Sequence, residues 1–595
     1  MKRGFQETHL QERKVSQIDF DTQLTAKQIS ERLSFPQRLD TLPDYSYAGY
    51  RSGSVPLPHV DNIVKNIYPT NDQTDRTWEI QSAIDSMAGT PGVILFEEGE
   101  YWLSGNQGLR LGSSVVLRGE SSMPSKTIFR VSGPPRNLFE FGEVNPSGIL
   151  QPSLGISSII QKYVGVGSTS VEVRDVSSFK IGQSISLNRV VSQSWLDAMN
   201  MSSLERHGKK ETWIAVGTIV QQEREIKAIQ DNHLVWEVPL TDSIDLALSE
   251  NNATVVAYQP PTRIQQSAIE NVFIIQLNST SGLEVGTPAI LPIRFGGSED
   301  CWLKNVQASG FLEYAYLAPA SRRITMADCV VIRDQPTSNG GKGALPLDIT
   351  LAGSQALILR GKTLGKENTA SYIVATARLA AGPNVISGYI ATGSSRHMIE
   401  PHQRWSTGLL VEGSWTGQIN MKNRGILGSG HGWCMGAGVV WGSFASKLTI
   451  QTPPLSQNFQ VNSQEVNNWQ DLNSTMGQFT IANSLYQTQL ASRIGSEAAS
   501  KILSIGGQGV LVAKIPSVKS ESSIPGDNPS PLRAETPALE TDNPLLEDPP
   551  SRDTDTPSIS NVTSFRTKIA LLGDDPAFLV VNAPLLGNTP SILDR

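Results

Sequence analysis

Short apolar segments recur along the second half of the chain, and polar residues rich in glycine and asparagine separate them. From residue 263 onward they include A-I-E-N-V-F-I-I, C-W-L-K-N-V-Q, I-T-M-A-D-C-V-V-I, N-V-I-S-G-Y-I and S-K-L-T-I-Q. Their starts are irregularly spaced, mostly in the range expected for the coils of a β-solenoid. Because one coil cannot bury its own apolar face, the pattern predicts strands that stack on neighbouring coils, with glycine and asparagine at the corners.

A helical pattern precedes these strands near the beginning of the chain. Residues 75–88, D-R-T-W-E-I-Q-S-A-I-D-S-M-A, carry apolar side chains, including Trp78, near helical spacing, and the helix should end before Gly89. The segments G-V-I-L-F and S-S-V-V-L-R-G-E follow and predict strands. A helix that leads directly into strands can cap the open end of a solenoid, where backbone edges would otherwise be exposed.

The composition and the apolar-polar pattern of the sequence change at several further points. Residues 162–258 alternate between apolar and polar positions with frequent turns, which predicts an inserted antiparallel β-domain. A segment rich in proline, serine and acidic residues near the end predicts a disordered linker. The expected parts are an N-terminal extension (1–60), the start of the β-helix with its capping helix (61–161), the inserted β-domain (162–258), the main body with the active-site cleft (259–515), the disordered linker (516–565) and an apolar C-terminal tail (566–595).

Composition and charge exclude several classes of protein. The net charge of -7 argues against a general nucleic-acid-binding protein. No apolar run is long enough for a transmembrane segment, and no signal peptide is visible, so we expect a cytoplasmic protein, or a secreted one if a leader was removed. Cys301, Cys329 and Cys434 form no C-x-x-C pair, which indicates neither a zinc site nor a disulfide framework. The oligomeric state is not predicted by any of these features.

The candidate chemistry is concentrated in residues 396–433, which contain three of the seven histidines. The segments read R-H-M-I-E-P-H-Q-R-W-S-T-G and M-K-N-R-G-I-L-G-S-G-H-G-W. The distance in sequence from His402 to Arg424 is close to one turn of a parallel β-solenoid, so a chain coiling with that step would stack His402, Arg404 and Arg424 on one face. Imidazole and guanidinium groups side by side suit an anionic or proton-transferring substrate.

Several motifs carry a resemblance to a known family. W-E-I-Q-S-A-I-D-S, G-V-I-L-F-E-E-G-E-Y and V-V-L-R-G-E resemble the opening coil of the pectate lyase superfamily of right-handed parallel β-helices. P-H-Q-R-W-S-T-G-L-L, N-R-G-I-L-G-S-G-H-G-W and Q-T-P-P-L-S-Q-N-F are similar to a bacterial, polysaccharide-lyase-like branch of it. The resemblance covers about residues 43–460 and departs at 367–372, E-N-T-A-S-Y, where we expect a basic Arg-His pair. It implies an all-β fold, a right-handed parallel β-helix with an N-terminal capping helix and an inserted small β-domain.

The activity implied by the resemblance is that of a carbon-oxygen lyase, which cleaves a uronic-acid-containing polysaccharide by β-elimination. A base removes the proton next to the carboxylate, an acid protonates the leaving oxygen, and a cation neutralises the carboxylate. His402 and His431 are the candidate base and acid, and Arg404 and Arg424 the candidate carboxylate ligands, although Arg404 could be the base itself. The expected substrate-binding residues are Trp405, Trp433, Lys304, His397 and Glu400.

No resident cofactor is expected. A Ca²⁺ ion is the one metal considered, with Glu299, Asp300 and Asp334 as its ligands.

Three other functions stay open. An intracellular cyclase or isomerase would use the same histidines and arginines on a small molecule. A glycoside hydrolase needs two carboxyl groups about 5–10 Å apart, and this stretch offers only Glu400 and Glu412. A purely binding role, as in an adhesin or a tailspike-like module, is a weaker alternative. The predicted partner is therefore an acidic polysaccharide or a small molecule.

Overall fold

The computed structural model describes residues 17–18, 24–33, 39–278, 287–335, 345–467 and 484–504. These residues all belong to one compact unit, which spans Met1–Val510. The predicted linker at 516–565 and the predicted tail at 566–595 lie outside the described residues.

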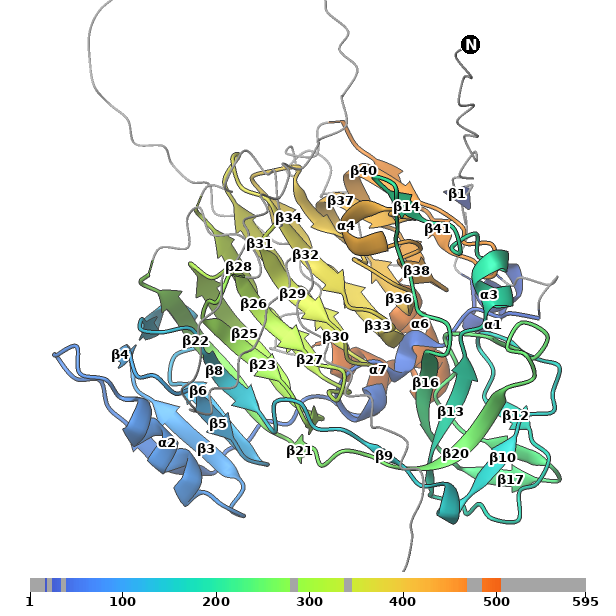
Figure 1. The fold of residues 1–595 in the computed structure, drawn as a ribbon. Helices are drawn as coiled ribbons and strands as arrows, with labels where there is room; N and C mark the ends of the chain where they lie inside the picture. Colours follow the sequence, from blue (N-terminus) through green and yellow to red (C-terminus); the bar gives the residue numbers. More distant parts are fainter. Residues whose placement is uncertain are drawn as a thin grey trace, which may run out of the picture. The chain divides into compact units, whose positions relative to one another are not determined.

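Parallel strands stack coil upon coil and form three faces of a β-helix (Figure 1). The strands of the first face, in stacking order, are β2 (Ile63–Ile67), β3 (Gly92–Phe96), β6 (Val115–Gly119), β22 (Ala268–Gln276), β25 (Trp302–Ser309), β27 (Thr325–Ala327), β30 (Leu357–Leu359), β33 (Ala381–Ser387), β36 (Ser406–Glu412), β39 (Val439–Trp441), β41 (Phe459–Val461) and β1 (Gln17–Ile18). The second face consists of β4 (Gly99–Leu103), β7 (Thr127–Val131), the ends of β22 and β25, β28 (Val330–Arg333), β31 (Lys362–Gly365), β34 (Ile390–Thr392), the beginnings of β37 (Trp415–Met421) and β40 (Phe444–Ile450), and β42 (Gln464–Glu465).

The third face carries the segment richest in candidate chemistry. It consists of β5 (Leu109–Leu111), β8 (Asn137–Phe141), β23 (Leu291–Phe295), β26 (Glu313–Leu317), β29 (Leu347–Leu351), β32 (Ser371–Thr376), β35 (His397–Ile399) and the ends of β37 and β40. Two short parallel pairings join neighbouring coils at the corners, β21 (Ile264–Gln265) with β24 (Ser298–Glu299) and the start of β36 with β38 (Met435–Gly436).

Apolar side chains stack in register inside the coils. One ladder on the first face consists of Ile269, Leu303, Met326, Ile358, Ile386, Val411 and Val440, all of them buried. Burying these side chains removes apolar surface from water, which stabilises the fold by roughly 25 cal/mol for each Å² of apolar surface buried. The predicted all-β parallel β-helix is confirmed, because the apolar segments find their partners on neighbouring coils.

The helix predicted near the beginning of the chain caps the first coil. It is α2 (Thr77–Ser86), and its side chains Ile80, Ala83 and Ile84 join the main core. Trp78 is different, because its side chain is 81% exposed although we expected it on the apolar stripe. Residues 80, 84 and 87 lie on one side of the helix, and position 78 falls outside that stripe.

The inserted domain is built from antiparallel strands. Its main sheet contains β9 (Ile149–Leu150), β10 (Ile156–Ser158), β13 (Ser184–Val190), β16 (Ile219–Glu225) and β20 (Ala253–Gln259). Smaller pairings join β11 (Tyr163–Val164) to β19 (Ile244–Asp245), β12 (Ser170–Glu172) and β17 (Ala228–Gln230) to β18 (His233–Val235), and β14 (Glu205–Arg206) to β15 (Lys209–Lys210). The domain has its own apolar core, and its helix is α3 (Gln193–Ala198). It begins before the predicted residue 162, because β9 and β10 pair with β20.

Segments from both ends of the described chain cover the outside of the first face. They are α1 (Ala26–Arg32), η2 (Tyr45–Tyr47), η3 (Tyr50–Gly53), α6 (Leu485–Ile494) and α7 (Ser496–Leu503). Tyr45 and Tyr486 are fully buried there, in a second apolar cluster that includes Leu357 and Val439. In the described part of the chain, no helix has the length and apolar character needed to cross a membrane.

Candidate active site

Two loops of successive coils lie side by side and carry the candidate catalytic residues. The first, residues 400–405, connects β35 to β36, and the second, residues 422–434, follows β37 and contains α4 (Leu427–Gly430). Backbone hydrogen bonds join the loops: Arg404 N donates to the carbonyl of His431 at 3.0 Å, and Trp405 N donates to that of Trp433 at 2.9 Å. Neighbouring coils thus bring His402, Arg404, Arg424 and His431 together, which we call the His-Arg cluster.

The side chains of the His-Arg cluster contact one another directly. Arg424 Nη1 lies 2.8 Å from His402 Nδ1 and 3.0 Å from the His402 carbonyl oxygen. The rings of His402 and His431 have centroids 4.9 Å apart. Arg404 Nη2 donates to the carbonyl and the hydroxyl of Ser429 at 2.9 and 2.7 Å. The guanidinium of Arg404 is therefore held by the loop that carries His431.

The contact with Arg424 determines which nitrogen of His402 carries the proton. A guanidinium can only donate, so Nδ1 of His402 is the acceptor. In the neutral ring the proton is then on Nε2. His402 consequently presents an N–H donor on the side away from Arg424.

The His-Arg cluster is positively charged overall. Glu400, which is 3% exposed, accepts a hydrogen bond from Asn420 at 2.6 Å and pairs with Lys422 at 3.3 Å and Arg424 at 3.4 Å. Arg404 is the third cationic side chain of the site, and Glu400 is the one carboxylate set against the three. With neutral imidazoles the group carries two net positive charges, in a chain whose net charge is -7. The site therefore attracts an anion against the overall field of the protein.

Both imidazoles of the cluster are neutral at ordinary pH. Burial is the main cause that holds the pKa of His402 well below its usual value. The positive charge of Arg424 is the second cause, and further positive charge nearby adds to it. Burial and the charges of Arg424 and Arg404 lower the pKa of His431 to about 3. The sequence does not predict these lowered pKa values, because it shows neither the burial of the two rings nor the arginines beside them.

His431 is the histidine of the cluster whose ring is unsatisfied. The residue is 3% exposed, and neither of its ring nitrogens has a hydrogen-bond partner among the described residues. Gly428 (φ 58°, ψ -125°) lies against the ring, and a Cβ atom there would come within 2.2 Å of Nε2. A buried polar group without a partner costs about 1–3 kcal/mol. Such an orphaned imidazole indicates that a polar ligand belongs beside it.

Tyr372 is a member of the site that the sequence did not reveal. It lies on β32, in register with Met398 of the next coil, and its ring meets that of His402 edge to face at 5.0 Å. The Arg424 guanidinium carbon lies 6.0 Å from the Tyr372 ring centre. Burial raises the pKa of Tyr372, while Arg424 opposes the rise, so the phenol carries its proton. The only signal was the departure at E-N-T-A-S-Y, which places a phenol where we expected basic residues.

The two tryptophans predicted to bind substrate have another position. Trp405 and Trp433 are 3% and 7% exposed and belong to an apolar cluster with residues of the inserted domain. Trp405 Nε1 donates to Asp242 at 3.1 Å, and Trp433 Nε1 donates to the carbonyl of Met199 at 3.2 Å. Both rings therefore pack between the inserted domain and the β-helix, and their role as substrate ligands stays a prediction.

His397 and Lys304 do not join the cluster. His397 is fully buried, and its ring nitrogens are bonded to the hydroxyls of Thr369 and Ser371 at 3.0 and 2.9 Å. Burial lowers the pKa of His397 to about 4. Lys304 lies on the first face in register with Glu270, several coils before His402. Glu400 is in the cluster, as the buried counter-ion already described.

The carboxylates considered for calcium are committed to arginines. Asp300 receives Arg323 Nε at 2.8 Å, and Glu299 pairs with Arg323 at 3.1 Å. Asp334 follows β28, a strand of the second face. Within the described ranges, no group of three or more histidine, cysteine, aspartate or glutamate residues could hold a metal ion. The residues present therefore do not fit the predicted Ca²⁺ site.

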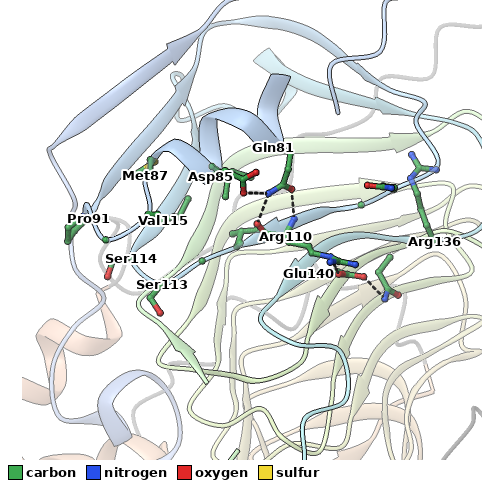
Figure 2. A pocket seen from close by; sticks show the side chains of 18 of the residues that line it. Gln81, Asp85, Met87, Pro91, Arg110, Ser113, Ser114, Val115, Arg136 and Glu140 are labelled. Carbon is green, nitrogen blue, oxygen red and sulfur yellow. Dashed lines mark hydrogen bonds and ion pairs between the residues drawn. The ribbon is translucent and has the colours of Figure 1, made fainter. Parts of the chain in front are cut away.

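A separate groove lies at the capped end of the β-helix. Its volume is about 1000 Å³, and residues of α2, β5 and the start of β8 line it. Figure 2 shows Gln81 bonded to Asp85 and to the backbone of Arg110, with Glu140 beside the Arg110 side chain. Glu140 also accepts from Asn137 at 3.0 Å. Both carboxylates in the groove are thus bonded, in contrast to the imidazole of His431.

Comparisons with known proteins leave the family open. No protein-family model matches the chain, and no curated protein matches it. Solved structures with some likeness are phage tailspikes. A tailspike variant of E. coli bacteriophage HK620 in complex with a pentasaccharide has 12% identity and a TM-score of 0.33, covering 64% of this chain and 50% of that one. The Gp54 tailspike of Acinetobacter baumannii bacteriophage AP22, in complex with a capsular saccharide, has 10% identity and a TM-score of 0.22, covering 66% and 76%.

The tailspike gp49 from Pseudomonas phage LKA1 has 12% identity and a TM-score of 0.23, covering 65% of this chain and 74% of that one. The chain spans about half the length of the HK620 tailspike. Likeness at this level carries no conclusion about activity, which has to come from the site.

Proposed function

We propose that the protein is a carbon-oxygen lyase that cleaves a uronic-acid-containing polysaccharide by β-elimination at the His-Arg cluster. One observation carries the proposal. A neutral, orphaned imidazole, that of His431, lies in a cluster with two net positive charges, in which the ring of His402 contacts both His431 and the protonated phenol of Tyr372. The motifs that resemble the pectate lyase superfamily support the same chemistry.

The first task of such a site is to bind the substrate carboxylate. The guanidinium groups of Arg404 and Arg424 are the ligands, since they neutralise the carboxylate and stabilise the negative charge that develops when the neighbouring carbon loses its proton. Burial is the main cause of the low pKa of His431, and the charges of Arg424 and Arg404 add to it; the substrate carboxylate offsets those two charges. Substrate binding thereby raises the basicity of His431 at the moment when a base is needed.

The elimination itself moves one proton at each end. The lone pair of His431 takes the proton from the carbon next to the carboxylate, and the electron pair of that C–H bond forms the new double bond. The C–O bond to the leaving sugar breaks, and its oxygen takes the hydroxyl proton of Tyr372. His431 ends as an imidazolium and Tyr372 as a phenolate, and proton exchange with water restores both.

This assignment differs from a mechanism in which His402 and His431 act as the base and the acid. A neutral imidazole N–H is a far weaker acid than a phenol, so we assign protonation of the leaving oxygen to Tyr372. His402, with its proton on Nε2, orients the substrate by donating a hydrogen bond. Hydrolysis is less well supported at this cluster, because Glu400 is ion-paired and Glu412 is buried and bonded to Ser387 and Ser484.

The test uses the ultraviolet absorbance of the unsaturated product. The protein is incubated with polygalacturonate, alginate, hyaluronan and chondroitin, and with dextran as a neutral control. Elimination leaves a double bond conjugated to the carboxylate and raises the absorbance, whereas hydrolysis produces reducing ends without it.

We expect a rise with at least one polyuronate, its loss in His431→Ala and Tyr372→Phe, and its retention in His59→Ala, a matched variant of an exposed histidine. A flat trace with every polyuronate contradicts the proposal. It would favour the alternative of a cyclase or isomerase that uses the same side chains on a small molecule.

A further inference from the structure

The loop that carries His431 is held from outside by the inserted domain. Arg206, on the hairpin β14–β15, donates from Nη1 to the carbonyl oxygen of Gly428 at 2.7 Å. Trp213 Nε1 donates to the carbonyl of Trp433 at 3.2 Å. Residues on both sides of His431 are therefore fixed by groups from a separate domain.

The loop also packs tightly against that domain. A Cβ atom on Gly432 would come within 2.4 Å of the Trp213 ring, and one on Gly430 within 3.1 Å of Glu211. Gly428, Gly430 and Gly432 all have positive φ angles, between 55° and 84°. The loop is held partly by its own backbone hydrogen bonds, from His431 N to the carbonyl of Leu427 at 3.1 Å and from Gly432 N to that of Gly425 at 3.0 Å. The contacts with the inserted domain add to these and fix the carbonyl of Gly428.

We propose that Arg206 is a positioning residue for His431, through which the inserted domain completes the active site. The inference rests on the proposed function, because it takes His431 to be the base. The backbone of Gly428 is the link, since its Cα lies against the imidazole while its carbonyl is bonded to Arg206. Without this hydrogen bond the loop relaxes, and Nε2 of His431 is no longer in position to accept the reacting proton.

The side chain of Arg206 can be removed without disturbing the contact surface, here called the seat, that holds the inserted domain on the β-helix. The seat consists of Trp195, Trp213, Trp405 and Trp433, with the rings of Trp195 and Trp213 stacked 5.1 Å apart. Arg206 lies outside that cluster, on the hairpin of two short strands, β14 and β15, which form a two-stranded sheet of their own in the described part of the chain. Removing its side chain therefore leaves the domain in place while it releases the Gly428 carbonyl.

The test compares three variants of the hairpin in the full chain. Arg206→Ala should lower kcat about 10- to 100-fold, because a misplacement of about 1 Å has effects of that size, and leave KM within about two-fold. Arg206→Lys keeps one donor and should recover part of kcat. Lys209→Ala changes the exposed residue opposite Arg206 in the same hairpin and should match the unmodified protein. The melting temperature of each variant shows whether the fold is intact.

A second readout does not depend on activity. Hydrogen exchange of the amides in residues 425–433 should be faster in Arg206→Ala and unchanged in Lys209→Ala. If the unmodified protein eliminates a polyuronate while Arg206→Ala keeps its kcat, the positioning role is overturned and the proposed function stands. If the unmodified protein has no elimination activity, the proposed function fails, and equal exchange in Arg206→Ala overturns the link between Arg206 and the loop.

Discussion

Replacing His431 by glutamine should make the protein more resistant to mild acid. The pKa of His431 is about 3 in the folded protein, against 6.5 for an unperturbed histidine. Between these values the unfolded chain binds a proton that the folded protein does not, so the free energy of unfolding rises with pH. The stabilisation is fully present above pH 6.5 and is lost progressively as the pH falls toward 3.

The size of the effect follows from the difference between the two pKa values. One pKa unit corresponds to between 1 and 2 kcal/mol, so the full contribution is about 5 kcal/mol, of which about 2 kcal/mol is lost at pH 5. The charged and titratable groups around the ring are Arg404, Arg424 and His402. From the inserted domain, Glu211 lies against Gly430 and Arg206 is bonded to Gly428, on the same loop. Burial and the charges of the two loop arginines are the main causes, and all of them lower the pKa of His431.

The assay is urea unfolding from pH 7 to pH 4, with His59→Gln as the matched variant of an exposed histidine. The unmodified protein should lose stability more steeply than His431→Gln, so that the difference between the two curves shifts by about 2 kcal/mol in favour of the variant between pH 7 and pH 5. Parallel curves for the unmodified protein and His431→Gln would refute the reasoning, because they would mean that His431 titrates alike in the folded and unfolded states.

Three further predictions concern the same loops. Gly428→Ala should abolish elimination activity and lower the free energy of unfolding by about 1–3 kcal/mol, since the residue has a positive φ and the new Cβ meets His431; activity and urea unfolding check this. Arg424→Lys should lower kcat/KM at least about ten-fold, because a lysine cannot keep both the His402 contact and the Glu400 pair; steady-state kinetics with unchanged melting would show it. Trp405→Phe should cost about 1–3 kcal/mol of stability through the lost bond to Asp242 and leave kcat nearly unchanged, and a large fall in kcat with normal stability would contradict that structural role.

The sequence alone determined the β-helix and part of its site. Apolar segments such as A-I-E-N-V-F-I-I must be buried on neighbouring coils, which is a property of local pattern and therefore legible from residues in order. The separation of His402 from Arg424 is also local, because it spans one coil without an insertion. Both features depend on short stretches of chain, in which spacing translates directly into position.

Tertiary structure alone decided the rest. Tyr372 reaches His402 through the register of β32 on β35, which depends on turn lengths that the pattern does not encode. The tryptophans became buried because the inserted domain docks on them across a large distance in sequence. The protonation of His431 follows from burial and from charges on two loops, and such fields depend on distances in space. The residue type determines which chemical groups are available, whereas the packing around a residue determines its protonation state and its contacts.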